Sequence, residues 1–227
     1  MVKGLVKNMS LSANKENYLK TIFDLSYDRK KITNKNIADV LQVSAPSVTE
    51  MMRSLQNDGL VTHTPYNQIA LTESGQQLAT KMVRRHRIWE SFLSQKLGYG
   101  IEELHNAADT LEHATDDLLI SRLNEFLGEP ERCPHGGIIP DNSPLAFDED
   151  EKILREIKEN MTVTITRVID NHDFLMYFDS LNLKIGDKLT ILGHQPFDGT
   201  INVSDTHGRF LNISPKSADY IFVKITD

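Results

Sequence analysis

Apolar residues in the first 62 positions recur every three or four residues, in three segments separated by polar turns. This spacing gathers apolar side chains on one face of a helix. It predicts a helix over residues 13–26, a short helix that begins after Thr33, and a third that begins after Ser44 and ends at Gly59. The predicted buried face of the third helix consists of Val48, Met51, Met52 and Leu55.

Two stretches rich in β-branched residues follow, over 60–64 and 68–72, and Pro65, Tyr66 and Asn67 between them suit a hairpin turn. Two helices joined by a tight turn and followed by a hairpin form a winged helix-turn-helix. We therefore expect residues 1–75 to fold as a domain of this kind.

Helical spacing returns after Thr72 and continues to about Leu97, and two more helical stretches follow near 101–113 and 115–127. A segment rich in Gly, Pro and Asp, over 136–150, is predicted to be a linker. Residues 76–147 are accordingly predicted to form a helical domain.

Beyond Lys152 the pattern changes to an alternation with a period of two. Glycines separate the predicted short strands, which cover 161–169, 188–192, 200–203, 209–213 and 220–225. This pattern is typical of a small β-barrel of the SH3-like kind, here over residues 148–227. The predicted fold class is therefore mostly α with a small β domain.

Composition restricts the setting of the protein. No apolar run approaches the roughly 20 residues of a membrane span, and the N-terminal segment has the pattern of neither a signal peptide nor an anchor. Cys133 is the only cysteine, so an internal disulfide is excluded, as is typical of a reducing compartment. We expect a cytoplasmic protein that makes no membrane contact.

The net charge of −7 conceals an asymmetry along the chain. Residues 1–90 hold 13 Lys and Arg against 8 Asp and Glu, whereas residues 91–227 hold 12 against 24. A basic front part suits contact with a polyanion. An acidic rear part suits cation binding, or solubility alone.

The third helix offers an outer face for reading DNA. If its apolar residues point inward, its polar side chains point outward and reach phosphates or base edges in the major groove. The candidate DNA-binding residues are Lys35, Ser44, Pro46, Ser47, Thr49, Glu50 and Arg53. A three-helix fragment that only packs is the alternative, and the hairpin with the local basic excess favours DNA. Because a single winged helix-turn-helix buries only a small interface with DNA, we expect a symmetric dimer.

The middle of the chain carries side chains that ligate metals. Asp109, Glu112 and His113 are three and four positions apart, so a helix places them on one face. Two carboxylates and an imidazole suit manganese, iron or zinc. A solvated acidic helix has the same pattern, so this motif alone does not decide.

A second set of donors strengthens the case for a metal. His86 and Glu90 are one helical turn apart, and Cys133 and His135 bring a thiolate and an imidazole together. A lone cysteine is more often a small buried hydrophobe than a ligand. Several such signals in one short domain favour metal binding.

Taken in order, these motifs resemble the DtxR/MntR family of metal-dependent repressors, most closely its manganese-responsive ScaR/SloR branch. The resemblance covers nearly the whole chain and rests on SAPSVTEMM (44–52), RRHRIWESFL (84–93), DTLEH (109–113) and CPHGGIIP (133–140). It implies a repressor, not an enzyme, that metal activates to bind operators of metal-uptake genes as a homodimer. The C-terminal domain would then be an SH3-like, FeoA-like domain.

The resemblance also implies two metal sites. The primary site would consist of Asn17, Asp109, Glu112 and His113. The secondary site would consist of His86, Glu90, Cys133, His135 and Asp170. As a ligand, Asp170 would link the C-terminal domain to the middle domain. An equal alternative is that Asp170 is only a turn residue that follows a strand. Mn²⁺ is the implied metal, with Fe²⁺ as the alternative and Zn²⁺ as an ion that binds in vitro.

This chain departs from its relatives at two positions of the first helix. Relatives in this branch carry an Asp where this chain has Asn17, whose amide is an uncharged donor that water or Glu16 would have to supplement. The other manganese branch carries a Glu where this chain has Lys20, which argues against a two-metal cluster.

The implied mechanism is a switch in which metal links the first helix to the helix of Asp109, Glu112 and His113. This link sets the spacing between the two DNA-binding domains of the dimer. Two other functions remain open. One is a metal-dependent hydrolase that uses those three residues with a bound water. The other is a winged-helix regulator that responds to an organic ligand.

Overall fold

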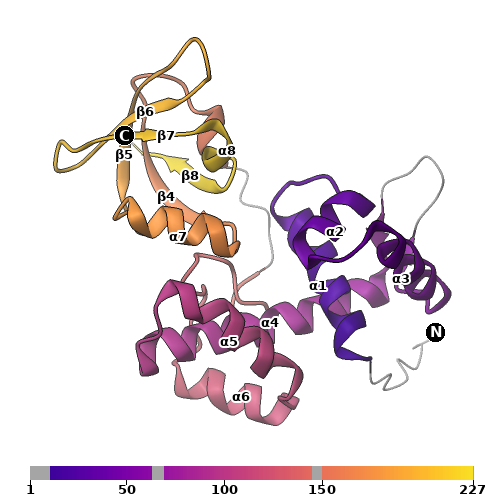
Figure 1. Cartoon of the computed structure of the whole chain (residues 1–227). Coiled ribbons are helices and arrows are strands. Elements are labelled where there is room, and N and C mark those ends of the chain that lie inside the picture. The colour runs from indigo at the N-terminus through magenta and orange to yellow at the C-terminus, as the bar shows by residue number, and fades with distance from the viewer. Residues whose placement is uncertain (1–10, 63–68, 145–149, 227) are drawn as a thin grey trace. The chain divides into compact units, whose positions relative to one another are not determined.

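The computed structural model describes residues 11–62, 69–144 and 150–226, apart from the side chains of residues 101 and 102. The chain divides into two compact units, Met1–Arg85 and His86–Asp227, and Figure 1 labels their elements. Among the described helices, none combines the length and the apolarity that crossing a membrane requires.

The first unit is a winged helix-turn-helix. It contains α1 (Ala13–Tyr27), α2 (Asn34–Leu41), α3 (Ala45–Asn57), β1 (Val61–Thr62), β2 (Ala70–Leu71) and the start of α4 (Glu73–Leu97). β1 and β2 pair antiparallel, as a wing requires. The predicted turn at Pro65, Tyr66 and Asn67 lies outside the described residues.

Local capping explains why these helices begin and end where they do. The side chains of Ser12, Thr33 and Ser44 accept hydrogen bonds from backbone N–H groups three residues later. Gly59, with φ +72°, ends α3 in the left-handed region. The core side of α3 is narrower than predicted, because Val48, Met52 and Leu55 are buried whereas Met51 is only half-buried.

In the second unit, the rest of α4 packs with α5 (Ile101–His113) and α6 (Asp117–Phe126). One apolar cluster joins Ile88 of α4 to Ile120 and Leu123 of α6 and to Cys133 and Ile139 of the following loop. The prediction of a linker over 136–150 is wrong for its first part, because residues 136–140 are buried. These residues pack as part of the unit.

The C-terminal part is an antiparallel sheet in the order β3-β8-β4-β5-β6-β7. Its strands are β3 (Glu151–Ile153), β4 (Thr162–Val168), β5 (Lys188–His194), β6 (Ile201–Asp205), β7 (Phe210–Ile213) and β8 (Ile221–Ile225). In the described part of the chain β3 and β7 do not pair with each other, so the predicted barrel is an open, SH3-like sheet. The predicted class, mostly α with a small β domain, is confirmed.

Four elements of this part were not predicted from the sequence: β3, the 3-10 helix η1 (Leu154–Glu156), α7 (His172–Ser180) and α8 (Pro215–Ala218). α7 follows directly after β4, and Asn171 caps it by accepting a hydrogen bond from the N–H of Phe174. α7 contacts α5, which brings the end of β4 and residue Asp170 toward the helices of the same unit.

Candidate metal centre and DNA-reading surface

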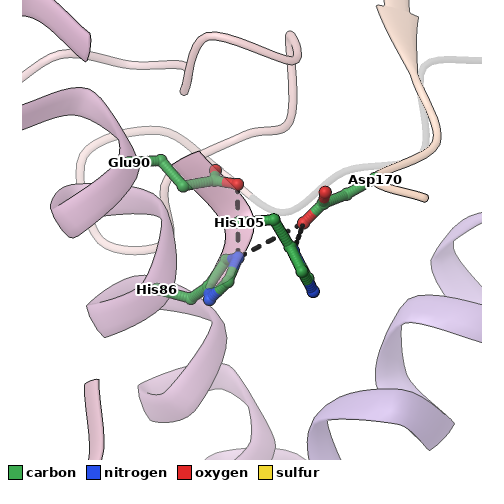
Figure 2. A group of neighbouring side chains, drawn as sticks. All are labelled: His86, Glu90, His105 and Asp170. Carbon is green, nitrogen blue, oxygen red and sulfur yellow. Dashed lines mark hydrogen bonds and ion pairs between the residues drawn. The ribbon is translucent and has the colours of Figure 1, made fainter. Parts of the chain in front are cut away.

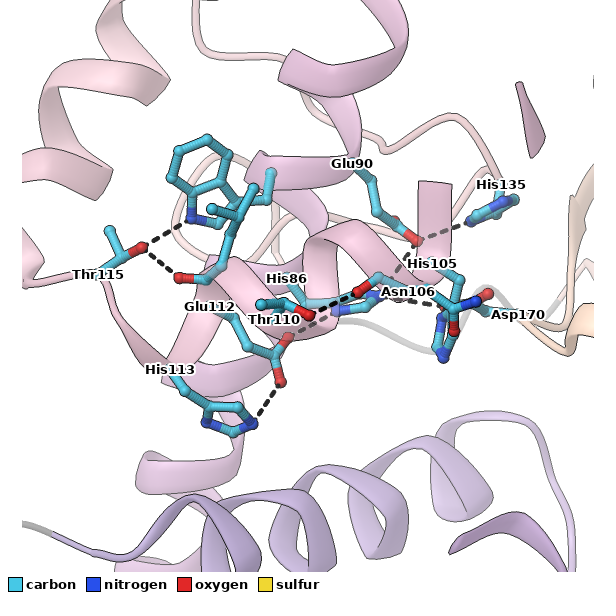
Figure 3. Close-up of polar contacts among 12 residues, drawn as sticks. His86, Glu90, His105, Asn106, Thr110, Glu112, His113, Thr115, His135 and Asp170 are labelled. Carbon is cyan, nitrogen blue, oxygen red and sulfur yellow. Dashed lines mark hydrogen bonds and ion pairs between the residues drawn. The ribbon is translucent and has the colours of Figure 1, made fainter. Parts of the chain in front are cut away.

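His86 lies at the middle of a network of buried polar side chains, drawn in Figure 3. Its Nδ1 is 2.6 Å from Oε2 of Glu112, a residue of α5 that is completely buried. Asp109, one turn before Glu112, offers a carboxylate oxygen within 4.8 Å of the same two groups. His86, Asp109 and Glu112 therefore form one set of converging donors.

The other ring nitrogen of His86 faces a second set, shown in Figure 2. Its Nε2 is 3.2 Å from Oε1 of Glu90 and 3.2 Å from Oδ2 of Asp170. His105 completes this set, with Nδ1 at 2.8 Å from Oδ2 of Asp170. The imidazole of His86 thus contacts three carboxylates. They belong to Glu90 on α4, Glu112 on α5 and Asp170, two residues after the end of β4.

Sequence reasoning missed His105. The signal was present, since His105, Asp109 and Glu112 are spaced i, i+4 and i+7, which places them along one face of α5. His105 was overlooked because its nearest carboxylate partner, Asp170, lies 65 residues away in the chain.

A third set includes the cysteine. Glu90, Cys133 and His135 are all buried, and their donor atoms lie within 4.8 Å of one another. Nδ1 of His135 is 3.0 Å from Oε1 of Glu90. Because Glu90 also belongs to the set around His86, the two sets share this residue.

Several donor atoms in these sets are buried yet lack hydrogen bonds among the described residues. They are Oε1 of Glu90, both ring nitrogens of His135 and Oδ1 of Asp170. Nδ1 of His135 approaches Oε1 of Glu90 as an ion pair. Buried polar atoms without partners are rare and destabilising. A cation held by nitrogen, oxygen and sulfur would satisfy them, so these residues fit a divalent transition metal.

Electrostatics prepares these groups to hold a cation. Burial raises the pKa of Glu90, but the charges of His135 and His86 outweigh that effect and hold the pKa well below its usual value. Burial likewise opposes ionisation of Asp170, and His105 and His135 lower its pKa well below the usual range. Both carboxylates therefore stay charged at neutral pH.

The thiol and the imidazole of the third set hold protons more tightly than usual. Burial and the charge of Glu90 raise the pKa of Cys133. Burial opposes the charged form of His135, but Glu90 and Asp170 raise its pKa well above the ordinary value. Metal ligation by these two residues would therefore release protons.

Family models match almost the whole chain. The iron-dependent repressor N-terminal DNA-binding domain matches residues 10–69, and the iron-dependent repressor metal-binding and dimerisation domain matches residues 72–141. A FeoA domain matches residues 153–225. The diphtheria toxin repressor of Corynebacterium efficiens is 29% identical over 192 residues, which are 79% of this chain and 83% of the relative.

Solved structures agree with the family models. The manganese regulator SloR is 37% identical, with a TM-score of 0.85 over 95% of this chain and 100% of SloR. The structure of ScaR with bound Zn²⁺ is also 37% identical, with a TM-score of 0.82 over 93% of this chain and 99% of ScaR. The chain belongs to the DtxR/MntR family. It is a metal-dependent, DNA-binding transcriptional repressor, near the manganese branch.

Within this repressor, the structure gathers most of the predicted metal ligands. His86, Glu90, Cys133, His135 and Asp170 all belong to the connected sets. Asp109 and Glu112 converge with His86, whereas His113 lies beside them, with Nε2 at 3.5 Å from Oε1 of Glu112. Asn17 is half-buried on α1 in the first unit, and its role as a ligand stays a prediction.

The predicted DNA-reading residues of the repressor lie along α3, including its N-cap, and on α2. Those that are exposed are Lys35, Ser44, Pro46, Ser47, Glu50 and Arg53. Thr49 is only half-buried, and its hydroxyl is engaged, since it donates to the carbonyl of Ala45 and accepts from Nδ2 of Asn34. Thr49 is therefore less available to DNA than the others.

Proposed function

We propose that Mn²⁺ activates this repressor, with Fe²⁺ as the alternative, and that it binds operators of metal-uptake genes as a homodimer. The observation that carries the proposal is the convergence of buried, incompletely hydrogen-bonded donors around His86 and Glu90. Oxygen-rich sets with imidazole suit both ions. SloR is a manganese regulator, and the matching family models are those of iron-dependent repressors, which supports these two metals.

We assign metal binding to the two predicted sites. The primary ligands are Asn17, Asp109, Glu112 and His113. The secondary ligands are His86, Glu90, Cys133, His135 and Asp170. A bound divalent ion supplies positive charge that offsets the buried carboxylates and favours the thiolate of Cys133. The 2.6 Å contact between His86 and Glu112 supports a coupling of the two sites.

DNA binding is assigned to the exposed side of α3. Ser44 and the N-terminal end of that helix, whose dipole favours negative charge, suit a phosphate. Ser47, Glu50 and Arg53 are exposed and spaced i, i+3 and i+6, so they reach one groove together. Lys35 on α2 adds an attraction to the DNA phosphates that does not depend on the base sequence.

Dimerisation is assigned to an apolar surface on the second unit. α6 exposes Leu118, Leu119 and Phe126, with exposed fractions of 66%, 49% and 65%. Leu97 and Tyr99, at and beyond the end of α4, are exposed as well. Large exposed apolar patches mark interaction sites. This surface lies within the segment that matches a metal-binding and dimerisation domain, so we propose a second copy of the chain as its partner.

The three predicted domains then divide the work. Residues 1–75 read DNA, residues 76–147 bind metal and dimerise, and residues 148–227 contribute Asp170. Ligation of one ion by Asn17 and by the donors of α5 would fix the position of α1. The position of α1 would in turn set the spacing between the two DNA-binding domains of the dimer. Metal-binding free energy would thereby favour the DNA-competent arrangement. The site of action is the compartment that holds the DNA, the cytoplasm.

We infer that the cluster regulates and does not catalyse, since repression is the activity of the family. A hydrolase would turn over generic esters in the presence of Mn²⁺, which this proposal does not expect. A winged-helix regulator that responds to an organic ligand would bind DNA in the absence of metal.

One titration tests the proposal. The full-length protein is titrated with Mn²⁺, Fe²⁺ and Zn²⁺ at fixed ionic strength, and binding to a duplex that contains an operator of a metal-uptake gene is measured by fluorescence anisotropy. We expect binding to appear with metal and to vanish with a chelator. Binding that is indifferent to the chelator would refute metal activation.

A further inference from the structure

The loop that carries Cys133 and His135 forms a closed turn. The N–H of Cys133 donates to the carbonyl of Gly137, and the N–H of Gly136 donates to the carbonyl of Cys133, each at 2.9 Å. Arg132 adds a hydrogen bond from Nη1 to the carbonyl of Gly136, at 2.7 Å. Both metal-ligating side chains therefore belong to one small, internally bonded piece of backbone.

Arg87 holds this turn against α4. It follows His86 directly in the sequence and is 8% exposed. Its Nη1 donates to the carbonyl of Ile138 at 2.6 Å. A Cβ on Gly137 would lie 3.0 Å from both Cζ and Nε of Arg87, so the guanidinium packs along bare backbone. The residue that bonds and contacts this loop is thus adjacent in sequence to His86, on the same helix.

The opposite side of the turn packs on β4. The N–H of Val168 donates to the carbonyl of His135 at 2.9 Å. A Cβ on Gly136 would lie 2.2 Å from the carbonyl oxygen of Thr166, so only glycine permits this approach. Asp170 comes two residues after Val168. The turn therefore links the ligands of α4 to the ligand that follows β4.

We propose that Arg87 is a positioning residue of the metal centre, whose guanidinium fixes the Cys133–His135 turn so that its sulfur and imidazole face Glu90. A buried guanidinium is costly to desolvate, and a turn held only by packing would not require it. Its fork of donors is rigid, which suits it to orienting a carbonyl.

This proposal rests on the proposed function only in taking Cys133 and His135 as ligands. The test uses Co²⁺ as the probe, because a thiolate bound to Co²⁺ gives a charge-transfer absorption in the near ultraviolet. Full-length parent, Arg87→Met, Arg87→Lys and Cys133→Ser are titrated with Co²⁺, and DNA is left out. Arg155→Met, which removes an exposed arginine from the C-terminal part of the chain, is the matched control.

We expect Arg87→Met to weaken the Co²⁺ affinity reported by the thiolate band by about 10- to 100-fold, the usual loss when a group that orients a metal ligand is removed. Arg87→Lys should recover part of the affinity, because an ammonium can still reach the carbonyl. Arg155→Met should match the parent. An unchanged band and affinity in Arg87→Met would overturn the proposal.

Two further results keep the test decisive. If Arg87→Met does not fold, Gly137→Ala replaces it, since the added Cβ forces the guanidinium to shift by a few tenths of an ångström. The thiolate band should then weaken in a folded protein, and an unaltered band would contradict the proposal. A parent that shows no thiolate band at all would instead refute the ligand assignment of Cys133, and the positioning role with it.

Discussion

His86 and Glu112 lie 2.6 Å apart, Nδ1 to Oε2, in the interior of the second unit, although they are 26 residues apart in sequence. The opposite ring nitrogen of His86 approaches Glu90 and Asp170. One imidazole is therefore in contact with both predicted metal sites.

Glu112→Ala should abolish metal-dependent DNA binding while the protein remains a folded dimer. Glu112 is a proposed ligand and also the contact that links His86 to α5. Operator affinity is measured by anisotropy at matched salt, with Mn²⁺ present, and circular dichroism and sedimentation check fold and assembly. Operator affinity equal to that of the parent would count against the assignment of the primary site.

Cys133→Ser should change the metal preference. A thiolate favours Zn²⁺ over Mn²⁺, whereas a hydroxyl does not, so we expect Zn²⁺ affinity to fall about tenfold more than Mn²⁺ affinity, a difference of about 1.4 kcal/mol. Competition titrations with a chromophoric chelator measure both affinities. Equal losses for both metals would indicate that the sulfur is not a ligand.

His86→Gln should weaken both sites, and its effect should not add to that of Glu112→Gln. Residues in direct contact show interaction energies of about 0.5–3 kcal/mol in double-mutant cycles. Calorimetric titration with Mn²⁺ of the parent, the two single variants and the double variant supplies the cycle. Strict additivity would mean that the contact between these residues does not couple the sites.

Asn17→Asp should lower the Mn²⁺ concentration that DNA binding requires. A carboxylate is a charged oxygen donor, and the hard ion Mn²⁺ prefers it to an amide. We expect half-maximal DNA binding at about tenfold lower Mn²⁺, which corresponds to about 1.4 kcal/mol. Asn14→Asp, on the exposed start of α1, is the matched control for added charge. No shift, or the same shift in the control, would exclude Asn17 from the site.

Leu119→Glu and Phe126→Glu should each convert the dimer to a monomer, since a buried charge without a partner opposes association. Sedimentation velocity measures the mass. Leu192→Glu, which adds the same charge at an exposed leucine of β5, should leave the dimer intact. Dimers that persist in both α6 variants would place the interface elsewhere.

Much of the first unit and of the helix boundaries could be predicted from the sequence, because the determinants are local. Capping side chains, helical spacing and a left-handed glycine act within a few residues. For the same reason the pairs His86 and Glu90, and Asp109 and Glu112, could be recognised as sharing helix faces. Met51 was wrongly predicted to be fully buried, since spacing gives the centre of a buried face but not its width.

The helices, and the side chains that share a helix face, follow from local sequence, since they depend on neighbours within about one helical turn. Which of these faces meet depends on contacts between residues that are distant in the chain. His86 and Asp170 are 84 residues apart, and it is the packing of α7 against α5 that brings Asp170 and His105 together. The burial of residues 136–140, taken for a linker, likewise depends on Arg87 and β4, which are distant in the chain.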